Sequence, residues 1–256
     1  MKQIARLDYL DIQIYDELKT TLLVPQKDED GLAFNSTLFV NDSLAHEIFD
    51  LLNLPQTSST WGGKVLYKSD SREVFLSARQ FQKSLQFKGV FFLRADAITL
   101  IQVIIDFLMA RKIKFLVSRL DISFIIRNNK IYSLLEKCDF KNLTQYTLKK
   151  RKEIIYYKAY NSRFALVAYG KASQIKKEKG SDYLERFLKF YGLTALPDDL
   201  INLELRALGT DCCAEITEAI TEKIDLEKLK TLMIAQATKR IQFAPAIQNL
   251  FLKVSI

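Results

Sequence analysis

The sequence predicts an α+β fold in which antiparallel strands form sheets in two related halves, followed by C-terminal helices. Three observations lead to this prediction. Strand-like and helix-like periodicities alternate along the chain, their order recurs once, and the last part of the chain is periodic only in the helical sense. We expect residues 1–210 to form the two-halved domain, with halves at about 1–112 and 113–210, and residues 211–256 to pack on it as a helical segment.

The first half is predicted to open with a strand over residues 4–14. A helix over about 42–53 follows, because Asp42 and Ser43 supply capping oxygens and Pro55 lies just beyond its end. The next stretches predict a hairpin over 64–77 that turns at 69–71, a strand over 85–93, and a helix that Asp96 caps. The apolar positions of that helix recur at helical spacing: Ile98, Ile101, Ile104, Ile105 and Leu108.

The second half is predicted to repeat this order, starting from a long strand that contains "SRLDISFII". We then expect a short helix over 131–137, a hairpin over 153–171, a helix over 182–190 and a strand over 200–208. Beyond Gly209 the pattern is helical to about residue 242, and Pro245 is expected to interrupt it before a last short segment.

Two sequence echoes support an internal duplication. "ARLDYLDI" at 5–12 resembles "SRLDISFI" at 118–125, and "LYKSDSREVFL" at 66–76 resembles "YYKAYNSRFAL" at 156–166. The spacing between the echoes differs in the two copies, which inserted loops explain, and self-similarity of this kind indicates a repeated structural unit.

The run "SRLDISFII" at 118–126 has two different faces in an extended strand. Arg119, Asp121, Ser123 and Ile125 share one face, while the apolar residues between them share the other. We therefore expect one face to belong to a core and the other to carry polar groups.

Composition places the chain among globular proteins. Its 256 residues are 48% hydrophobic, enough to bury a substantial core. The longest apolar-rich stretch, 98–110, contains Gln102 and Asp106 and is too short to cross a bilayer, and the N-terminus lacks the apolar core of a signal peptide. These features predict a cytoplasmic protein without membrane contact. The three cysteines show neither a disulfide framework nor metal-site spacing.

The charge balance favours a polyanionic partner. The chain has 38 Lys and Arg against 30 Asp and Glu, a net charge of +8, and basic residues gather with tyrosines between 148 and 180. A solvated lysine-rich surface is the alternative. The candidate DNA-binding residues are Arg119, Lys149, Lys150, Arg151, Lys152, Lys158, Arg163, Lys176 and Lys177.

The order of four motifs resembles the replication initiators of rolling-circle plasmids and filamentous phages, which nick their own origin through a tyrosine. The motifs are "RLDYLDIQI", "SRLDISFI", "YYKAYNSRFALVAYGK" and "LELRAL". The resemblance implies the architecture of initiators and HUH-like endonucleases. It matches Asp121 to the first acid of the family, Tyr169 and Lys171 to its Tyr-x-Lys, and Glu204 to its late glutamate.

This resemblance implies a covalent phosphotyrosine intermediate. Tyr169 would be the nucleophile, Lys171 or Arg119 would contact phosphate, and Asp121 with Glu204 would hold Mg2+ or Mn2+. Two positions depart from the family pattern. The expected second acid is Ile125, and the acid expected after Tyr-x-Lys falls near Gln174, with Glu178 four residues further on.

Each candidate also has an ordinary structural interpretation. Asp121 could pair with Arg119 or Arg206, Glu204 could lie on the polar face of a half-buried strand, and Tyr169 could be an aromatic residue at a strand end. Three more tyrosines on the same hairpin are alternative nucleophiles or base-stacking platforms: Tyr156, Tyr157 and Tyr160.

We therefore expect an initiator that binds double- and single-stranded origin DNA, with C-terminal helices that could recruit a host helicase or a second copy. One alternative is a protein of the same fold that binds DNA without nicking it. Another is a mixed α/β protein whose basic face docks an acidic protein. The motifs of ATPases, dinucleotide enzymes, metalloproteases and zinc modules are missing from the sequence, and its single histidine, His46, excludes a histidine-pair metal site.

Overall fold

The structure is a computed structural model that describes residues 4–15, 43–61, 64–69, 73–78, 82–127, 130–151, 154–178 and 181–253. The strands are β1 (Ile4–Tyr15), β2 (Gln56–Trp61), β3 (Lys64–Ser69), β4 (Val74–Ala78), β5 (Gln82–Lys88), β6 (Lys114–Arg127), β7 (Asp139–Phe140), β8 (Thr144–Arg151), β9 (Ile154–Tyr160), β10 (Phe164–Gly170), β11 (Leu200–Leu208) and β12 (Ile241–Gln242). The helices are α1 (Ser43–Leu51), η1 (Phe91–Leu93), α2 (Ala97–Ala110), α3 (Ile131–Leu135), α4 (Lys171–Glu178), α5 (Ser181–Tyr191), α6 (Ala214–Glu222), α7 (Leu226–Thr238) and α8 (Pro245–Lys253).

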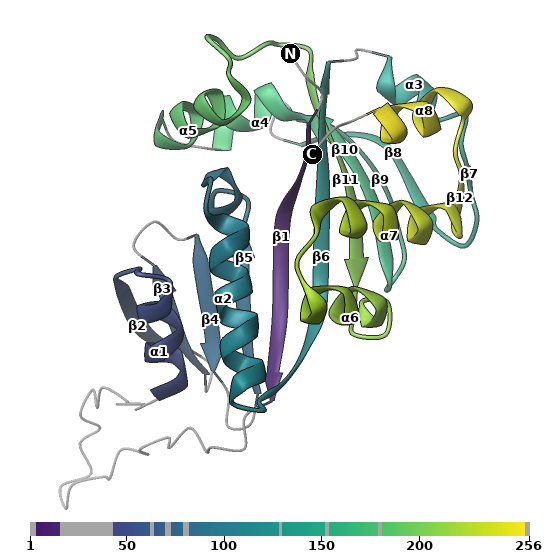
Figure 1. Ribbon diagram of the computed structural model, residues 1–256. Coiled ribbons are helices and arrows are strands. Elements are labelled where there is room, and N and C mark those ends of the chain that lie inside the picture. The colour runs from purple at the N-terminus through teal and green to yellow at the C-terminus, as the bar shows by residue number, and fades with distance from the viewer. Residues whose placement is uncertain are drawn as a thin grey trace, which may run out of the picture.

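Ten of the described strands form one sheet in the order β2-β3-β4-β5-β1-β6-β11-β10-β9-β8, and β7 pairs separately with β12. Every neighbouring pair in the large sheet is antiparallel. The predicted α+β fold with antiparallel strands is confirmed, and the strands of the two halves join in a single continuous sheet (Figure 1).

The two sides of this sheet follow the same strand order. On one side the order from the edge to the centre is β2, β3, β4, β5 and then β1. On the other side it is β8, β9, β10, β11 and then β6, so in each half the first strand in chain order lies innermost. The two innermost strands pair with each other, with Tyr9 opposite Asp121. The two Arg-Leu-Asp echoes therefore lie side by side at the centre of the molecule. The predicted domain boundaries themselves stay a prediction.

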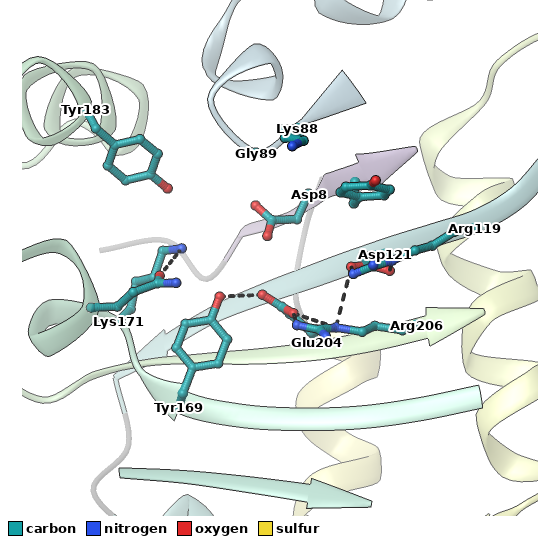
Figure 2. Close-up of a pocket in the computed structure, with 12 residues that line it drawn as sticks. Asp8, Lys88, Gly89, Arg119, Asp121, Tyr169, Lys171, Tyr183, Glu204 and Arg206 are labelled. Atoms are coloured by element: carbon teal, nitrogen blue, oxygen red, sulfur yellow. Dashed lines mark hydrogen bonds and ion pairs between the residues drawn. The ribbon is translucent and has the colours of Figure 1, made fainter. Parts of the chain in front are cut away.

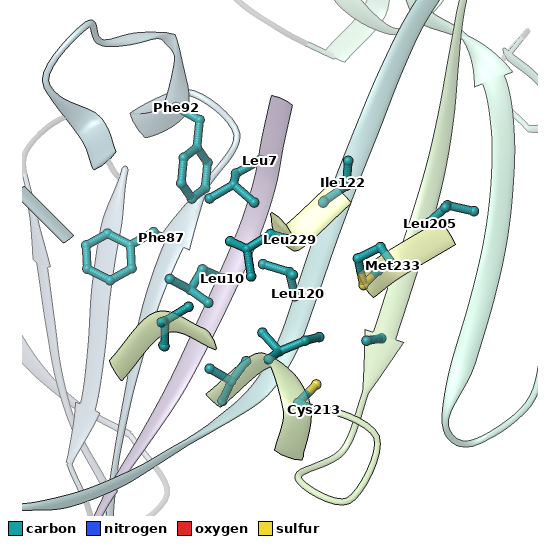
Figure 3. Packing of buried hydrophobic residues seen from close by; sticks show 14 of the residues in the cluster. Leu7, Leu10, Phe87, Phe92, Leu120, Ile122, Leu205, Cys213, Leu229 and Met233 are labelled. Carbon is teal, nitrogen blue, oxygen red and sulfur yellow. The ribbon is translucent and has the colours of Figure 1, made fainter. Parts of the chain in front are cut away.

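Helices cover the two faces of the sheet unequally. Residues of α1, α2, α3, α6, α7 and α8 pack with one face to form the main core, and Figure 3 shows Leu10, Leu120 and Leu205 of the sheet against Leu229 and Met233 of α7. On the other face, α4 and α5 form a smaller core with Ile125 and Leu200. The polar residues of the central strands lie on this second face.

Several details differ from the sequence predictions. The strand expected over 85–93 ends at Lys88, and Phe91–Leu93 form a 3-10 helix. The side chain of Asp96 caps no helix, because its carboxylate is bound by Arg94. Pro245 begins α8 instead of interrupting a helix, which suits proline because the first helical residue needs no N–H partner.

Besides η1, five elements were not predicted: β2, β7, β8, β12 and α4. Helix α4 is short and mostly polar, with Ala172 and Ile175 as its buried apolar residues, so the apolar periodicity that identifies helices is weak there. Within the described ranges, no helix is long and apolar enough to span a membrane.

Candidate functional site

A pocket of about 210 Å3 lies on the second face of the sheet, where the central strands meet α4 and α5 (Figure 2). It is smaller than the roughly 300–1,000 Å3 of pockets that enclose drug-sized ligands. Three carboxylates line it, from Asp8, Asp121 and Glu204. Four cationic side chains also line it, from Lys88, Arg119, Lys171 and Arg206.

Strand pairing brings these residues together. Because side chains alternate between faces, the polar positions of β6 and β11 point to the pocket, with Arg206 opposite Asp121 and Glu204 opposite Ser123. The four residues that the sequence proposed as catalytic or metal-binding all line this one pocket. Their chemical roles stay predictions.

Asp8 is a pocket carboxylate that sequence reasoning missed. It lies at a register shift in the pairing of β1 with β6, between Leu7 and Tyr9. The signal was present in the echo of the two Arg-Leu-Asp triplets, since Asp8 has the same place in its triplet as Asp121. Both aspartates line the pocket and both pair with the arginine two residues earlier.

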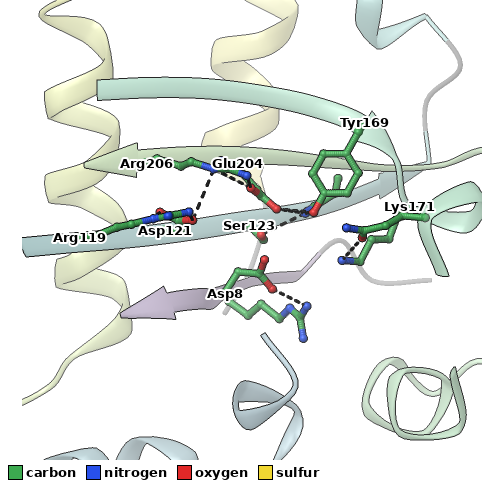
Figure 4. Close-up of polar contacts among 11 residues, drawn as sticks. Asp8, Arg119, Asp121, Ser123, Tyr169, Lys171, Glu204 and Arg206 are labelled. Atoms are coloured by element: carbon green, nitrogen blue, oxygen red, sulfur yellow. Dashed lines mark hydrogen bonds and ion pairs between the residues drawn. The ribbon is translucent and has the colours of Figure 1, made fainter. Parts of the chain in front are cut away.

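Glu204 is the centre of a buried hydrogen-bond network (Figure 4). One carboxylate oxygen accepts from the Tyr169 hydroxyl and from Asn202 Nδ2 at 2.6 Å, and the other accepts from Arg206 Nε at 2.9 Å. Asn202 Nδ2 also lies 2.6 Å from the Tyr169 hydroxyl and 3.2 Å from Ser123 Oγ. These contacts hold the Tyr169 hydroxyl in place.

Asp121 is buried between two arginines. Arg119 binds both of its oxygens, at 2.9 and 2.6 Å, and Arg206 Nε lies 3.4 Å away. The ion pairs considered in the sequence as an alternative to metal binding are therefore present. Burial raises the pKa of Asp121 to about 6 even though both arginines favour its charged form.

Asp8 of β1 and Lys171 of α4 also line the pocket. Arg6 Nη2 donates to Asp8 Oδ1 at 2.7 Å. Burial opposes ionisation of Asp8, but the charges of Arg6 and Lys171 outweigh it and lower the pKa of Asp8 to about 2. The Lys171 ammonium is almost fully buried and donates to the uncharged amide oxygen of Gln174 at 2.9 Å.

The pocket has two tyrosine hydroxyls in different electrostatic settings. Burial, with the negative charges of Glu204 and Asp8, raises the pKa of Tyr169 well above its usual value of 10. Tyr183 of α5 is also buried, but the nearby Lys171 and Arg6 charges more than offset this and lower its pKa. Tyr183 was not among the residues proposed from the sequence.

The donors present do not fit a divalent metal. In the described part of the chain, no three His, Cys, Asp or Glu side chains gather closely enough to hold one. Each pocket carboxylate is already bound by an arginine. Counting Arg6 behind Asp8, five cationic side chains face three carboxylates, so the pocket suits an anion better than a cation.

The proposed DNA-binding residues are spread over several elements. Arg119 lines the pocket, and Lys158 lies 4.1 Å from the ring centre of Tyr160 on β9. Arg163 and Lys177 are exposed, and Lys176 pairs with Asp198 at 2.7 Å. The structure describes the strand but not the side chains at Lys149, Lys150 and Arg151. Lys152 lies outside the described residues.

Tyr157 is not available as a nucleophile or stacking platform, because it is fully buried in the main core on the other face. Tyr160 lies opposite Ala165, packs against the small cluster of Ala165, Val167 and Tyr169 on the pocket face, and is half-buried. The side chain of Tyr156 lies outside the described part of the structure.

Similarity to known proteins is found among solved structures. No family model matches the chain, and no curated protein matches it. Among solved structures, the chain is similar to the rolling circle replication initiator protein from Geobacillus stearothermophilus, with a TM-score of 0.48 and 12% sequence identity, over 94% of this chain and 86% of that chain.

Gly89 is expected to be intolerant of a side chain because it borders the pocket beside Asp8. A Cβ at this position would lie 2.7 Å from Asp8 Oδ1, closer than real Cβ contacts. Gly89→Ala would displace the carboxylate from Arg6 and is expected to lower the free energy of unfolding by about 1–3 kcal/mol, the usual cost of overpacking. Urea denaturation measures this change in the free energy of unfolding.

Gly170→Ala is the matched control, because its Cβ would meet Ser173 Oγ at an ordinary 3.6 Å. Equal losses of stability in the two variants would contradict the steric explanation.

Proposed function

We propose that this protein is a DNA-binding replication initiator of a plasmid or phage-like mobile element, which holds a phosphodiester of the origin strand in the pocket between β1, β6, β10 and β11. One observation carries the proposal. The four motifs that resemble initiators lie far apart in the sequence, yet each contributes a charged side chain to this pocket or its entrance. We expect the protein to act in the cytoplasm.

The charge of the pocket supports binding of a phosphate. Guanidinium groups of Arg119 and Arg206 present planar donor pairs that suit phosphate oxygens. The Lys171 ammonium is buried, with the Asp8 carboxylate as a nearby negative charge and the uncharged Gln174 amide as a direct hydrogen-bond acceptor. A bound phosphate would add a negatively charged partner for this ammonium.

The surface around the pocket supports binding of a single strand. Lys88 lies 3.7 Å from the ring centre of Phe75, and Arg119 lies 4.2 Å from that of Tyr9. With Lys158 and Tyr160, these pairs place cations beside aromatic rings across the pocket face. Bases stack on such rings while the cations contact the backbone.

The proposal is tested by measuring DNA affinity at increasing salt concentration. Fluorescence anisotropy measures it with labelled single- and double-stranded DNA from the genetic element. We expect affinity to fall steeply as salt rises, and Lys171→Met to weaken binding and reduce the salt slope by about one. Lys228→Met is the control, since Lys228 pairs with Glu222 on the helices of the other face. Absent or salt-independent binding would refute the proposal and favour a protein partner.

A second candidate function is DNA binding without cleavage, as a regulator or tethering factor. The observation that favours it is the set of arginine-bound carboxylates, because metal-dependent nicking by Tyr169 needs acids that are available to Mg2+ or Mn2+. Recruitment of a host helicase and formation of a homodimer stay predictions.

Proton uptake by Asp121 is expected to make DNA binding pH-dependent. Its pKa of about 6 means that it is charged at pH 7.5 and mostly neutral at pH 5, so the pocket becomes more positive as pH falls. We expect DNA affinity to increase about tenfold over this range if a bound phosphate raises the pKa of Asp121 by about one unit.

Asp121→Asn should bind DNA with little dependence on pH in the same range. Asp8 contributes nothing to this dependence, because its pKa of about 2 keeps it charged throughout. A pH dependence that persists unchanged in Asp121→Asn would contradict the assignment.

A further inference from the structure

We infer that Tyr183 is the nucleophile of this pocket, that Arg6 and Lys171 stabilise its phenolate, and that Lys171 and Arg206 stabilise the phosphoryl group during strand cleavage in place of a divalent metal. The inference rests on the proposed function, since it needs a DNA strand in the pocket. It differs from the prediction that the sequence supports, in which Tyr169 attacks with the help of a metal ion.

The position of Tyr183 is the first argument. Helix α5 packs its apolar side in the smaller core, where the Tyr183 ring stacks on Phe187 at 6.2 Å between ring centres. The hydroxyl points from this wall into the pocket, opposite Tyr169 (Figure 2). Because the ring is packed on a helix, the oxygen is positioned before a strand binds, which is what an attacking group requires.

The surroundings of the two hydroxyls are the second argument. The Tyr169 hydroxyl is bound by Glu204 and Asn202, and its high pKa opposes formation of the phenolate. The Tyr183 hydroxyl accepts a hydrogen bond from Arg6 Nη2 at 3.5 Å, and the Lys171 ammonium lies 5.7 Å from its ring centre. Both cations stabilise a phenolate, in agreement with the lowered pKa of Tyr183.

The distribution of positive charge is the third argument. The attack places extra negative charge on the oxygens of the phosphoryl group, which a metal neutralises in many nucleases. Here the positive charges of Arg206 and Lys171 line the pocket, and Arg6 adds a third behind Asp8. Fixed guanidinium and ammonium groups in a buried site stabilise such charge without reorganisation.

The reaction balances without a co-reactant. The phenol proton of Tyr183 passes to water, and the phenolate oxygen forms a bond to phosphorus. The bond between phosphorus and one deoxyribose oxygen breaks, and that oxygen takes a proton from Lys171, which water then reprotonates. One side of the strand is left covalently attached to Tyr183, and the other side ends in a free hydroxyl.

The test is covalent adduct formation by the full-length protein. The protein is incubated with end-labelled single-stranded DNA and with supercoiled DNA from its own genetic element, in EDTA and in Mg2+ or Mn2+. Adducts are separated under denaturing conditions, and the modified tyrosine is identified by mass spectrometry of the peptides. Anisotropy on the same samples reports DNA binding.

We expect an adduct in EDTA that maps to Tyr183, falls at least 100-fold in Tyr183→Phe, and still forms in Tyr169→Phe. Tyr183→Phe keeps the ring and should still bind DNA. Tyr132→Phe is the matched control, because this half-buried tyrosine of α3 lies on the far face, and it should form the adduct like the unaltered protein.

The inference is overturned by an adduct on another tyrosine, by an adduct that needs a metal, or by DNA binding without any adduct. The last result would leave the proposed function standing and identify a binder that does not cleave. Absence of DNA binding would instead refute the proposed function.

Discussion

Arg206→Ala is expected to lower the free energy of unfolding by about 3–5 kcal/mol, because it leaves buried carboxylates without their compensating charge. Arg206 binds Glu204 and also lies 3.4 Å from Asp121 Oδ2. Both carboxylates are buried, with side chains 2% and 3% exposed. Asp121 keeps Arg119, but Glu204 would keep only the neutral donors Tyr169 and Asn202.

Urea denaturation measures this loss, and Arg127→Ala provides the matched control. Arg127 pairs with Asp199 across strands at 2.9 Å, but both side chains are exposed, so its removal should cost less than about 1 kcal/mol. Glu204→Gln in the Arg206→Ala background removes the uncompensated charge and should recover part of the loss. Similar losses in Arg206→Ala and Arg127→Ala would show that Glu204 is not an uncompensated buried charge in the variant.

The expected result bears on function because buried ion pairs seldom exist for stability alone. Replacing such a set by well-packed apolar residues is often neutral or stabilising. A cluster with Asp8, Asp121 and Glu204, each held by an arginine, is therefore better explained by what it binds. The surplus of positive charge, with a buried Lys171, agrees with the proposed binding of a phosphate.

Strand β11 shows how far the sequence alone leads to the site. Its alternation predicted that Leu203 and Leu205 face a core while Glu204 lies on a polar face, and the structure places the two leucines in the main core and Glu204 in the pocket. The period of two along a strand is a local property, so it can be recognised without knowing the fold.

Asp8 and Tyr183 show what local sequence patterns do not specify, although the echo of the two Arg-Leu-Asp triplets marks Asp8 as the counterpart of Asp121. The place of Asp8 beside Asp121 depends on the pairing of β1 with β6, two strands that are far apart in the chain. Helical periodicity predicted α5, but it does not specify that this helix packs on the polar face near Ile125 and directs Tyr183 into the pocket. Both facts depend on long-range packing, which no local pattern encodes.

Phe251→Ala is expected to lower the free energy of unfolding by about 3–5 kcal/mol, the usual cost of removing a buried phenylalanine. Phe251 of α8 is 1% exposed, and its ring meets that of Phe124 in β6 at 4.8 Å and that of Phe243 at 5.1 Å. The loss would show that the C-terminal helix is part of the main core, because Phe124 lies in the central strand whose other face carries Asp121.

The neighbouring Leu252→Ala is the control, since this side chain is 71% exposed and its removal should change stability by less than about 0.5 kcal/mol. Urea denaturation of both variants should give transitions with the slope of the unaltered protein, as expected when α8 and the sheet unfold together. A small effect of Phe251→Ala, or a separate early transition, would mean that α8 unfolds independently of the sheet. The strand that carries Asp121 would then not depend on α8 for its stability.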